Sequence, residues 1–344
     1  MIVRARAPLR LGFGGGGTDV APYCDLHGGH VMNAAIDKYA YVTVDDNIDG
    51  ALELSALDRD ATLRCAPGEL PAPGTVQPEL QLLAGAYARI VRDHLDGRAP
   101  ALRIRTYSDA PPGSGLGSSS TLVVALVTAL AEYFQLALGE YEIAQLAWEI
   151  ERSDLGLSGG KQDQYAAAFG GFNFMEFHRD RTIVNPLRIK DWVRAELEAS
   201  LLLYFTGVSR ESARIIDEQK RNAAAGQASS VDAMHRLKQE AVQMKEALLK
   251  GNLAGFAASM QSGWEAKKQM ASSISNPTID RFESVAVANG AIATKISGAG
   301  GGGFMMFMCD PADRVRLSRA LLGHGGSLLD FHFNPDGATA WRTP

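Results

Sequence analysis

The sequence predicts an α+β fold organised as two domains. Its 344 residues exceed the ordinary length of one domain, which is on the order of 100–200 residues. Segments with strand-like alternation and segments with helical periodicity occur in both halves of the chain. Hydrophobic residues make up 46% and charged residues 21%, the balance of a globular protein. The 36 glycines among 344 residues are a larger share than the ~7% usual in proteins, and many of them lie in three separate segments.

The first domain is expected over residues 1–190. Alternating or β-branched apolar residues predict its strands, and apolar residues at helical spacing predict its helices. The segment 67–78 carries four prolines and is a predicted loop. The predicted strands are 2–6, 40–44, 51–55 and 102–106, and the predicted helices are 79–95, 121–134, 140–153 and 162–169.

The second domain is expected over residues 191–344, because the composition turns charged and helical around 190–198. The pattern that follows predicts a sheet with helices on one side. The predicted strands are 200–205, 291–297, 303–309 and 327–333, and the predicted helices are 209–220, 231–249, 253–268, 279–288 and 313–322.

Charge and composition exclude several classes of function. The net charge of -5 gives no general attraction to nucleic acid or to an anionic membrane. The longest apolar run, 122–131, is too short to span a bilayer, and residues 1–8 contain no signal-peptide core. The three cysteines are odd in number and scattered, so no disulfide framework is expected. We therefore expect a cytoplasmic protein, with its oligomeric state, including a homo-oligomer, left open.

The most informative segment is PPGSGLGSSS at residues 111–120, here called the serine loop. Its glycines allow close backbone approach to a ligand, and its serines open the predicted helix 121–134. The first N–H groups of a helix have no internal partner and bind anions readily. An ordinary helix cap would also use serine, but it would not need three serines after three spaced glycines. The loop lacks the Gly-Lys-Ser/Thr ending of a P-loop, and it lacks the downstream acid of a dinucleotide fold.

Two further glycine-rich segments flank this loop in the sequence. The N-terminal glycine segment, 8–19, places Arg10 before its glycines and Thr18 and Asp19 after them, which are groups that could position a polyol. A flexible turn is the alternative interpretation of this segment. The C-terminal glycine segment, 295–304, has five glycines in six positions, more than a hairpin turn uses. We expect its backbone to pack closely against another loop or a ligand.

Two acidic residues between these segments fit phosphoryl transfer. Such a reaction needs a divalent metal on the nucleotide phosphates and a group that orients or deprotonates the acceptor hydroxyl. Mg²⁺ prefers oxygen ligands and keeps several waters, so Glu151 with one serine of the loop would suffice. Asp163, at the start of the predicted helix 162–169, suits the acceptor side. Each acid taken alone could be an ordinary solvated residue at a helix end.

Taken together, the three segments in this order resemble the GHMP kinases, over about residues 3–307. The likeness implies the two-domain GHMP kinase fold, with an N-terminal domain like ribosomal protein S5 domain 2 and a ferredoxin-like C-terminal domain. Residues 8–19, 33–39, 204–210, 274–277 and 298–303 look most like bacterial D-glycero-D-manno-heptose 7-phosphate kinases. L-Fucokinase domains share much of this pattern. Galactokinases have a Glu-His pair where this chain has Gly16 and Gly17, which argues against galactose.

The resemblance implies a role for each motif. ATP and Mg²⁺ are the expected cofactors, with Ser119 and Glu151 as the metal ligands, Asp163 as the acid-base or hydroxyl-orienting residue, and Arg10 beside it stabilising the transferred phosphoryl group. The C-terminal glycine segment would brace the site. The residues expected to contact ATP are Pro112, Gly113, Ser114, Gly115, Leu116, Gly117, Ser118, Ser119 and Ser120. The residues expected to bind substrate are Gly17, Thr18, Asp19, Gly160, Lys161, Arg210, Gly300 and Gly301.

The expected function is an ATP-dependent sugar kinase that phosphorylates the anomeric hydroxyl of D-glycero-D-manno-heptose 7-phosphate. Its product, a 1,7-bisphosphate, would lead to nucleotide-activated heptose for surface polysaccharide. The substrate phosphate needs further cations, and the candidates are Lys161, Arg210, Lys267 and Lys268. A kinase of a free sugar such as L-fucose is the alternative enzyme. A non-catalytic sensor of a sugar or nucleotide is disfavoured, because the acids and Arg10 are all present.

Overall fold

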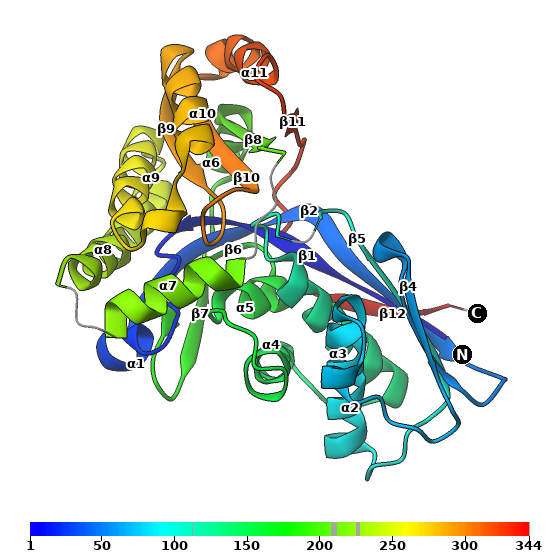
Figure 1. Ribbon diagram of the computed structural model, residues 1–344. Helices are drawn as coiled ribbons and strands as arrows, with labels where there is room; N and C mark the ends of the chain where they lie inside the picture. Colours follow the sequence, from blue (N-terminus) through cyan, green and yellow to red (C-terminus); the bar gives the residue numbers. More distant parts are fainter. Residues whose placement is uncertain (112, 208–211, 225–227, 344) are drawn as a thin grey trace.

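The computed structural model describes residues 1–111, 113–207, 212–224 and 228–343, which form two sheets with their helices (Figure 1). The larger sheet has eight strands, all antiparallel to their neighbours except for one parallel pair, β3 and β5. These strands are β1 (Ile2–Gly14), β2 (Gly29–Asp46), β3 (Leu52–Ala56), β4 (Ala61–Cys65), β5 (Leu102–Ser108), β6 (Phe172–Phe177), β7 (Thr182–Pro186) and β12 (Thr339–Thr343).

Helices from the first half of the chain cover one face of this sheet. The most buried is α3, which is apolar almost all round and lies against β1 and β2. A core of aliphatic side chains from these helices and strands fills the space between them. The helices are α1 (Tyr23–His27), α2 (Gln81–His94), α3 (Ser118–Phe134), α4 (Glu140–Glu149) and α5 (Gln162–Phe169), and a π-helical turn, Ile150–Asp154, follows α4.

An irregularity in β1 matters for the site. The register between β1 and β2 shifts between Pro8 and Arg10. Before the shift Ala7 packs in the core beneath α3, and after it Leu9 packs with residues of the second half of the chain. Because a bulge reverses which face a residue occupies, the shift turns the Arg10 side chain toward α5.

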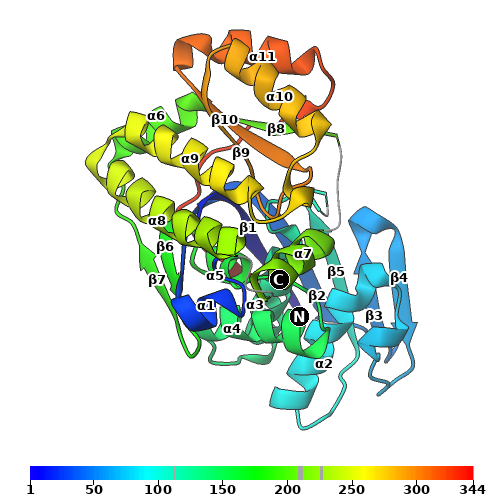
Figure 2. The ribbon, with the colours of Figure 1, turned by 60° about the vertical axis from the view of Figure 1, so that its left-hand side comes forward.

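The second half of the chain builds a four-stranded antiparallel sheet, in the order β11, β8, β10 and β9. Both of its faces are buried, and α8 and α9 run side by side next to it (Figures 1 and 2). The elements are α6 (Asp191–Ser200), β8 (Leu201–Phe205), α7 (Ser212–Ala224), α8 (Ala228–Lys250), α9 (Leu253–Lys268), α10 (Pro277–Ala288), β9 (Ala291–Ile296), β10 (Phe304–Cys309), α11 (Arg314–Leu322) and β11 (Ser327–Leu328).

The predicted strand 327–333 is wrong beyond Leu328. Past that residue the chain leaves the small sheet, because Phe331 and Phe333 pack into the cluster around Phe13. The chain then ends in β12, which pairs with β1 of the larger sheet. A division of the chain near residue 190 stays a prediction.

Most predicted elements exist, and the structure adds several that the sequence analysis did not predict, namely α1, β4, β6, β7 and β12. The helices predicted at 162–169 and 253–268 have the observed bounds. The predicted strand 40–44 is the end of a longer one, β2. In the described ranges no helix is long and apolar enough to cross a membrane. Cys24, Cys65 and Cys309 are buried free thiols.

Candidate active site

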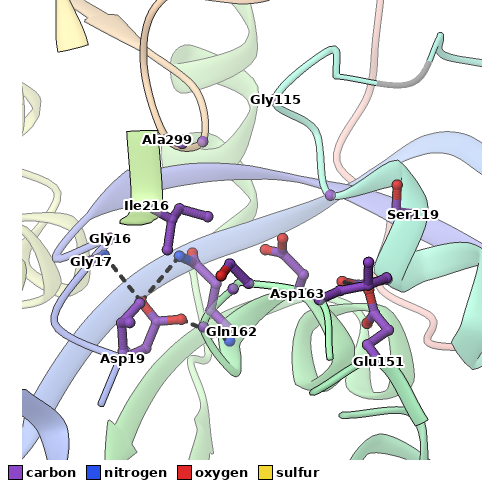
Figure 3. Close-up of a pocket in the computed structure, with 18 of the residues that line it drawn as sticks. Gly16, Gly17, Asp19, Gly115, Ser119, Glu151, Gln162, Asp163, Ile216 and Ala299 are labelled. Atoms are coloured by element: carbon purple, nitrogen blue, oxygen red, sulfur yellow. Dashed lines mark hydrogen bonds between the residues drawn. The ribbon is translucent and has the colours of Figure 1, made fainter. Parts of the chain in front are cut away.

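A cavity of about 480 Å³ brings the three glycine-rich segments together (Figure 3). The close approach expected for the C-terminal glycine segment is confirmed: the Phe304 N–H donates to the Ser114 carbonyl at 2.8 Å. A Cβ at Gly115 would lie only 2.3 Å from the Ser297 carbonyl oxygen. The residues that line the cavity are Arg10, Gly16, Gly17, Asp19, Val20, Gly113, Gly115, Gly117, Ser118, Ser119, Ser120, Glu151, Arg152, Leu157, Ser158, Gly159, Gly160, Gln162, Asp163, Ile216, Gln219, Lys267, Gly298 and Ala299.

The serine loop ends where α3 begins, at Ser118, so the first N–H groups of this helix open on the cavity. Gly117 has a φ of 78°, a conformation that glycine adopts without strain. Ser114 and Leu116, which belong to the loop, are buried and do not line the cavity. Pro112, also expected to contact ATP, lies outside the described residues. The loop therefore offers backbone and hydroxyl donors to an anion.

Glu151 is 2% exposed and lies in the π-helical turn at one end of the cavity. The Ser120 hydroxyl donates to its Oε1 at 3.0 Å, and the Gln164 amide donates to its Oε2. Burial raises the pKa of this carboxyl group. Ser119, expected beside Glu151 as a metal ligand, is exposed on the cavity wall, and its neighbour Ser120 makes the direct contact.

The oxygen atoms of Glu151 and the neighbouring serines fit a magnesium ion bound together with a nucleotide better than a metal ion held by protein side chains alone. Among the residues that the structure describes, no group of three His, Cys, Asp or Glu side chains could hold a metal. Mg²⁺ bound to a nucleotide takes most of its ligands from phosphates and water, and needs only one or two protein oxygens. Glu151 and the serine hydroxyls supply oxygens of this kind.

Asp163 lies at the centre of the cavity, between Asp19 on one side and Glu151 on the other (Figure 3). The Arg10 Nε donates to its Oδ1 at 2.8 Å, and Nη2 of the same guanidinium lies 2.6 Å from that oxygen. Arg10 is 3% exposed, whereas Asp163 is 24% exposed. A Cβ at Gly117 would lie 3.2 Å from Asp163 Cγ, so glycine there lets the serine loop approach the carboxylate.

Asp19 joins the N-terminal glycine segment to the start of α5. Its carboxylate accepts hydrogen bonds from the backbone N–H groups of Gly17 at 3.0 Å and Gln162 at 3.1 Å, and from the Gln162 side-chain amide at 3.4 Å (Figure 3). The backbone N–H of Lys161 also donates to it, at 2.9 Å. A Cβ at Gly160 would lie 1.9 Å from Asp19 Oδ2, so only glycine fits at that position. Gly17, Asp19 and Gly160 all line the cavity, as expected of substrate-binding residues.

Four other expected substrate residues have no place in the cavity wall. The Thr18 hydroxyl is buried and donates to the Gly15 carbonyl at 2.8 Å. The Lys161 ammonium lies 3.4 Å from the His178 carbonyl, away from the cavity. Gly300 and Gly301 belong to the C-terminal glycine segment but lie against the backbone of Ile274 instead of lining the cavity.

The remaining cationic candidates differ in their placement. Arg210 lies outside the described residues. Lys268 pairs with Glu265 and Glu283 outside the cavity, whereas Lys267, one residue earlier, is buried in the cavity wall. Helical periodicity could have separated these two lysines, because neighbouring residues on a helix face different directions.

Sequence reasoning missed several residues that line the cavity. Ile216 of α7 lies over Gln162 (Figure 3), and Gln219 of the same helix also lines the cavity. Arg152 lines the cavity next to Glu151, with its Nε buried and without a hydrogen-bond partner among the described residues. Apolar and amide side chains on a charged amphipathic helix carry no sequence signal for a site.

Comparisons with known proteins identify the family. A family model for the GHMP kinase N-terminal domain matches residues 81–171, and one for the C-terminal domain matches residues 244–326. A D-glycero-alpha-D-manno-heptose 7-phosphate kinase of Campylobacter jejuni is 45% identical over 341 residues, covering 99% of each chain. The chain belongs to the GHMP kinase family. This GHMP kinase therefore resembles, over its full length, an enzyme that phosphorylates a sugar.

Solved structures agree with that assignment. A D-glycero-D-manno-heptose 1-phosphate kinase from Bacteroides thetaiotaomicron has a TM-score of 0.84 at 43% identity, covering 99% of each chain. A mevalonate kinase has a TM-score of 0.75 at 19% identity and shares the fold alone. A bifunctional L-fucokinase/L-fucose-1-P guanylyltransferase of Bacteroides fragilis is 26% identical, and this GHMP kinase spans 36% of its length. The expected α+β GHMP kinase fold is confirmed.

Proposed function

We propose that this GHMP kinase transfers the γ-phosphoryl group of ATP to the anomeric hydroxyl of D-glycero-D-manno-heptose 7-phosphate. The observation that carries the choice of sugar is the 45% identity, over the full length of both chains, to the kinase of that substrate from Campylobacter jejuni. The product would be the heptose 1,7-bisphosphate, a precursor of nucleotide-activated heptose for surface polysaccharide. A cytoplasmic location fits this role.

In the proposed reaction the anomeric oxygen attacks the γ-phosphorus while the bond from that phosphorus to the β-bridging oxygen breaks. ADP leaves with the electron pair of the broken bond. The hydroxyl proton passes to the Asp163 carboxylate or is oriented by it, because this carboxylate lies at the centre of the cavity and is partly open. Arg10 holds the carboxylate in place and supplies positive charge beside the reacting group.

The nucleotide phosphates would bind at the serine loop, on the N–H groups at the start of α3. Glu151 and Ser119 would hold the Mg²⁺ of the nucleotide, with the Ser120 hydroxyl fixing the orientation of Glu151. The bound ion would neutralise phosphate charge during transfer. Gly113 to Ser120, with the neighbouring Pro112, remain the proposed ATP-binding residues.

The sugar would bind on the other side of Asp163, where Gly17, Asp19 and Gly160 line the cavity. Asp19 accepts three backbone hydrogen bonds and a fourth, at 3.4 Å, from the Gln162 side-chain amide, which together fill a carboxylate's capacity of about four. A sugar hydroxyl would therefore bind Asp19 by replacing the long contact with the Gln162 amide. The substrate roles of Thr18, Lys161, Arg210, Gly300 and Gly301 stay predictions.

The position of the new phosphate tests this proposal directly. The protein would be incubated with ATP, Mg²⁺ and the heptose 7-phosphate, and the product followed by ³¹P NMR. A second phosphorus resonance coupled to the anomeric proton is expected. Coupling to any other sugar proton would overturn the proposal. The heptose 1-phosphate should be tested as a second acceptor, because the similar protein from Bacteroides thetaiotaomicron is a D-glycero-D-manno-heptose 1-phosphate kinase.

A further inference from the structure

Lys267 is a buried amine that the proposed reaction has not yet used. It lies in the last turn of α9, is 3% exposed and lines the cavity. Its Nζ donates to the Gly298 carbonyl oxygen at 2.5 Å. This is its only hydrogen bond within the described ranges, and no carboxylate there lies within ion-pair distance. An ammonium has three N–H donors, so two remain for a ligand.

A chain of contacts places this amine beside the centre of the reaction. Gly298, which accepts its hydrogen bond, packs on the serine loop, where a Cβ at Gly298 would lie 2.9 Å from Gly115 Cα. The carbonyl of Gly115 accepts a hydrogen bond from Arg10 Nη1 at 2.5 Å, and Arg10 holds Asp163. On its other side, Lys267 Nζ would lie 3.6 Å from a Cβ at Gly16, in the N-terminal glycine segment.

We propose that the Lys267 ammonium binds the phosphoryl group in transfer, as a second cation beside Arg10. This inference rests on the proposed phosphoryl transfer but not on the identity of the sugar. In the transition state, negative charge spreads over the three equatorial oxygens of the phosphoryl group, and donors aimed at them lower the barrier. The lysine gains and loses no covalent bond in this role.

The 7-phosphate of the substrate is a less suitable ligand for this amine. The anomeric hydroxyl must lie at Asp163 to accept the phosphoryl group, and carbon 7 is at the opposite end of the sugar. Lys267 is close enough to Asp163 for that carboxylate to raise its pKa, and its hydrogen-bond partner Gly298 packs on the serine loop. One amine therefore cannot face both phosphates.

The charge of the amine depends on the groups around it. Burial lowers the pKa of Lys267 to about 8, although Asp19 and Asp163 act against this shift and Arg10 adds to it. Lys295 of β9, the other buried lysine nearby, has a pKa well below its ordinary value because of its own burial. Glu218 of α7 bonds to Ser272 and Ser273 instead. The free enzyme should therefore lose a useful positive charge as the pH rises through about 8.

The test compares K267M, K267R and the control K268M. The control changes the next residue of the same helix, whose ammonium pairs with Glu265 and Glu283 outside the cavity. We expect K267M to lower kcat on the order of 100-fold, with each KM changed only a few-fold, and K268M to leave kcat within about twofold. Wild-type kcat/KM should fall above about pH 8, and K267R should retain activity without that fall, because arginine does not deprotonate in this range.

Three results would overturn the proposal. K267M could raise the KM for the sugar phosphate with kcat unchanged, which would make Lys267 a ground-state contact of the substrate phosphate. K267M could behave like K268M. If K267M does not fold, by circular dichroism, a K267R profile that keeps the alkaline fall decides against the proposal. Should the wild type act on another sugar, the proposed substrate fails, and the same variants measured with that sugar still test Lys267.

Discussion

Arg10 and Asp163, 153 positions apart in the sequence, share one carboxylate oxygen, Oδ1, which accepts from Nε at 2.8 Å and lies 2.6 Å from Nη2. The arginine sits just past the register shift in β1, and the aspartate sits in the first turn of α5. The contact therefore fixes the proposed catalytic carboxylate, at the start of α5, against the sheet. Asp163 Oδ2 takes no part in it and stays available to a hydroxyl.

Replacing Asp163 by asparagine should lower kcat by at least ~100-fold, because the amide cannot accept the proton or hold it as a carboxylate does. ATP binding, measured by calorimetry with Mg-ATP, should change little, because the serine loop and the proposed sugar-binding residues lie on opposite sides of Asp163. D180N, at an exposed turn, is the control. Near wild-type turnover in D163N would remove Asp163 from the mechanism.

Glu151→Gln should raise the Mg²⁺ concentration needed for half-maximal activity by about 10-fold or more. The substitution removes the carboxylate charge at the metal end of the cavity and keeps the shape of the side chain. Titrating Mg²⁺ at saturating ATP measures the effect, and E140Q at the exposed start of α4 is the matched control. An unchanged magnesium requirement would exclude Glu151 as a ligand.

Gly160→Ala should lower kcat/KM on the order of 100-fold, because its Cβ would displace the Asp19 carboxylate and shift the start of α5. The control is Gly74→Ala, since a Cβ there meets nothing within 4 Å. Both variants should be assayed with the same sugar and checked for folding by thermal melting. If G160A were as active as G74A, Asp19 would not position the catalytic helix.

Stability should depend on pH through Lys267. Its pKa is about 8 in the folded protein and 10.5 without burial, so the unfolded chain binds more protons between these values. Stability therefore rises with pH across that window, and the penalty of burying the charge is complete below about pH 8. K267M should be more stable than the wild type at pH 7, by about 3 kcal/mol. Urea unfolding at pH 7 and pH 10 should show this advantage shrinking; a constant difference would contradict the pKa.

The sequence predicted helices with clear periodicity better than strands within irregular segments. Apolar spacing was sufficient for 162–169 and 253–268, the helices that carry Asp163 and Lys267. It was not sufficient for β12, because an exposed strand at a sheet edge has no apolar face to reveal it. Nor could it show that the chain leaves the small sheet after Leu328, since this depends on packing Phe331 and Phe333 against distant residues.

The site was predicted through its motifs, and the contacts between motifs needed the structure. Arg10, Glu151 and Asp163 carry chemistry that can be recognised in sequence, and the cavity contains all three. The Ser120 hydroxyl contacts Glu151, whereas Ser119 was the expected partner. Which serine faces Glu151 depends on the rotation of α3 about its axis, and the sequence at the start of a helix does not show that rotation. Lys267 could not be distinguished from a solvated lysine until α9 was packed against the C-terminal glycine segment.

The proposed acceptor of this GHMP kinase is a phosphorylated heptose. The most direct measurement is kcat/KM for ADP release with Mg-ATP and four acceptors: D-glycero-D-manno-heptose 7-phosphate, the same heptose without phosphate, L-fucose and galactose. We expect the 7-phosphate to exceed each of the others by at least ~100-fold, because a substrate phosphate that the enzyme binds contributes transition-state binding energy that the other acceptors lack. A higher kcat/KM for any unphosphorylated sugar would rule out the heptose 7-phosphate as the preferred acceptor and assign the enzyme to the free-sugar kinases.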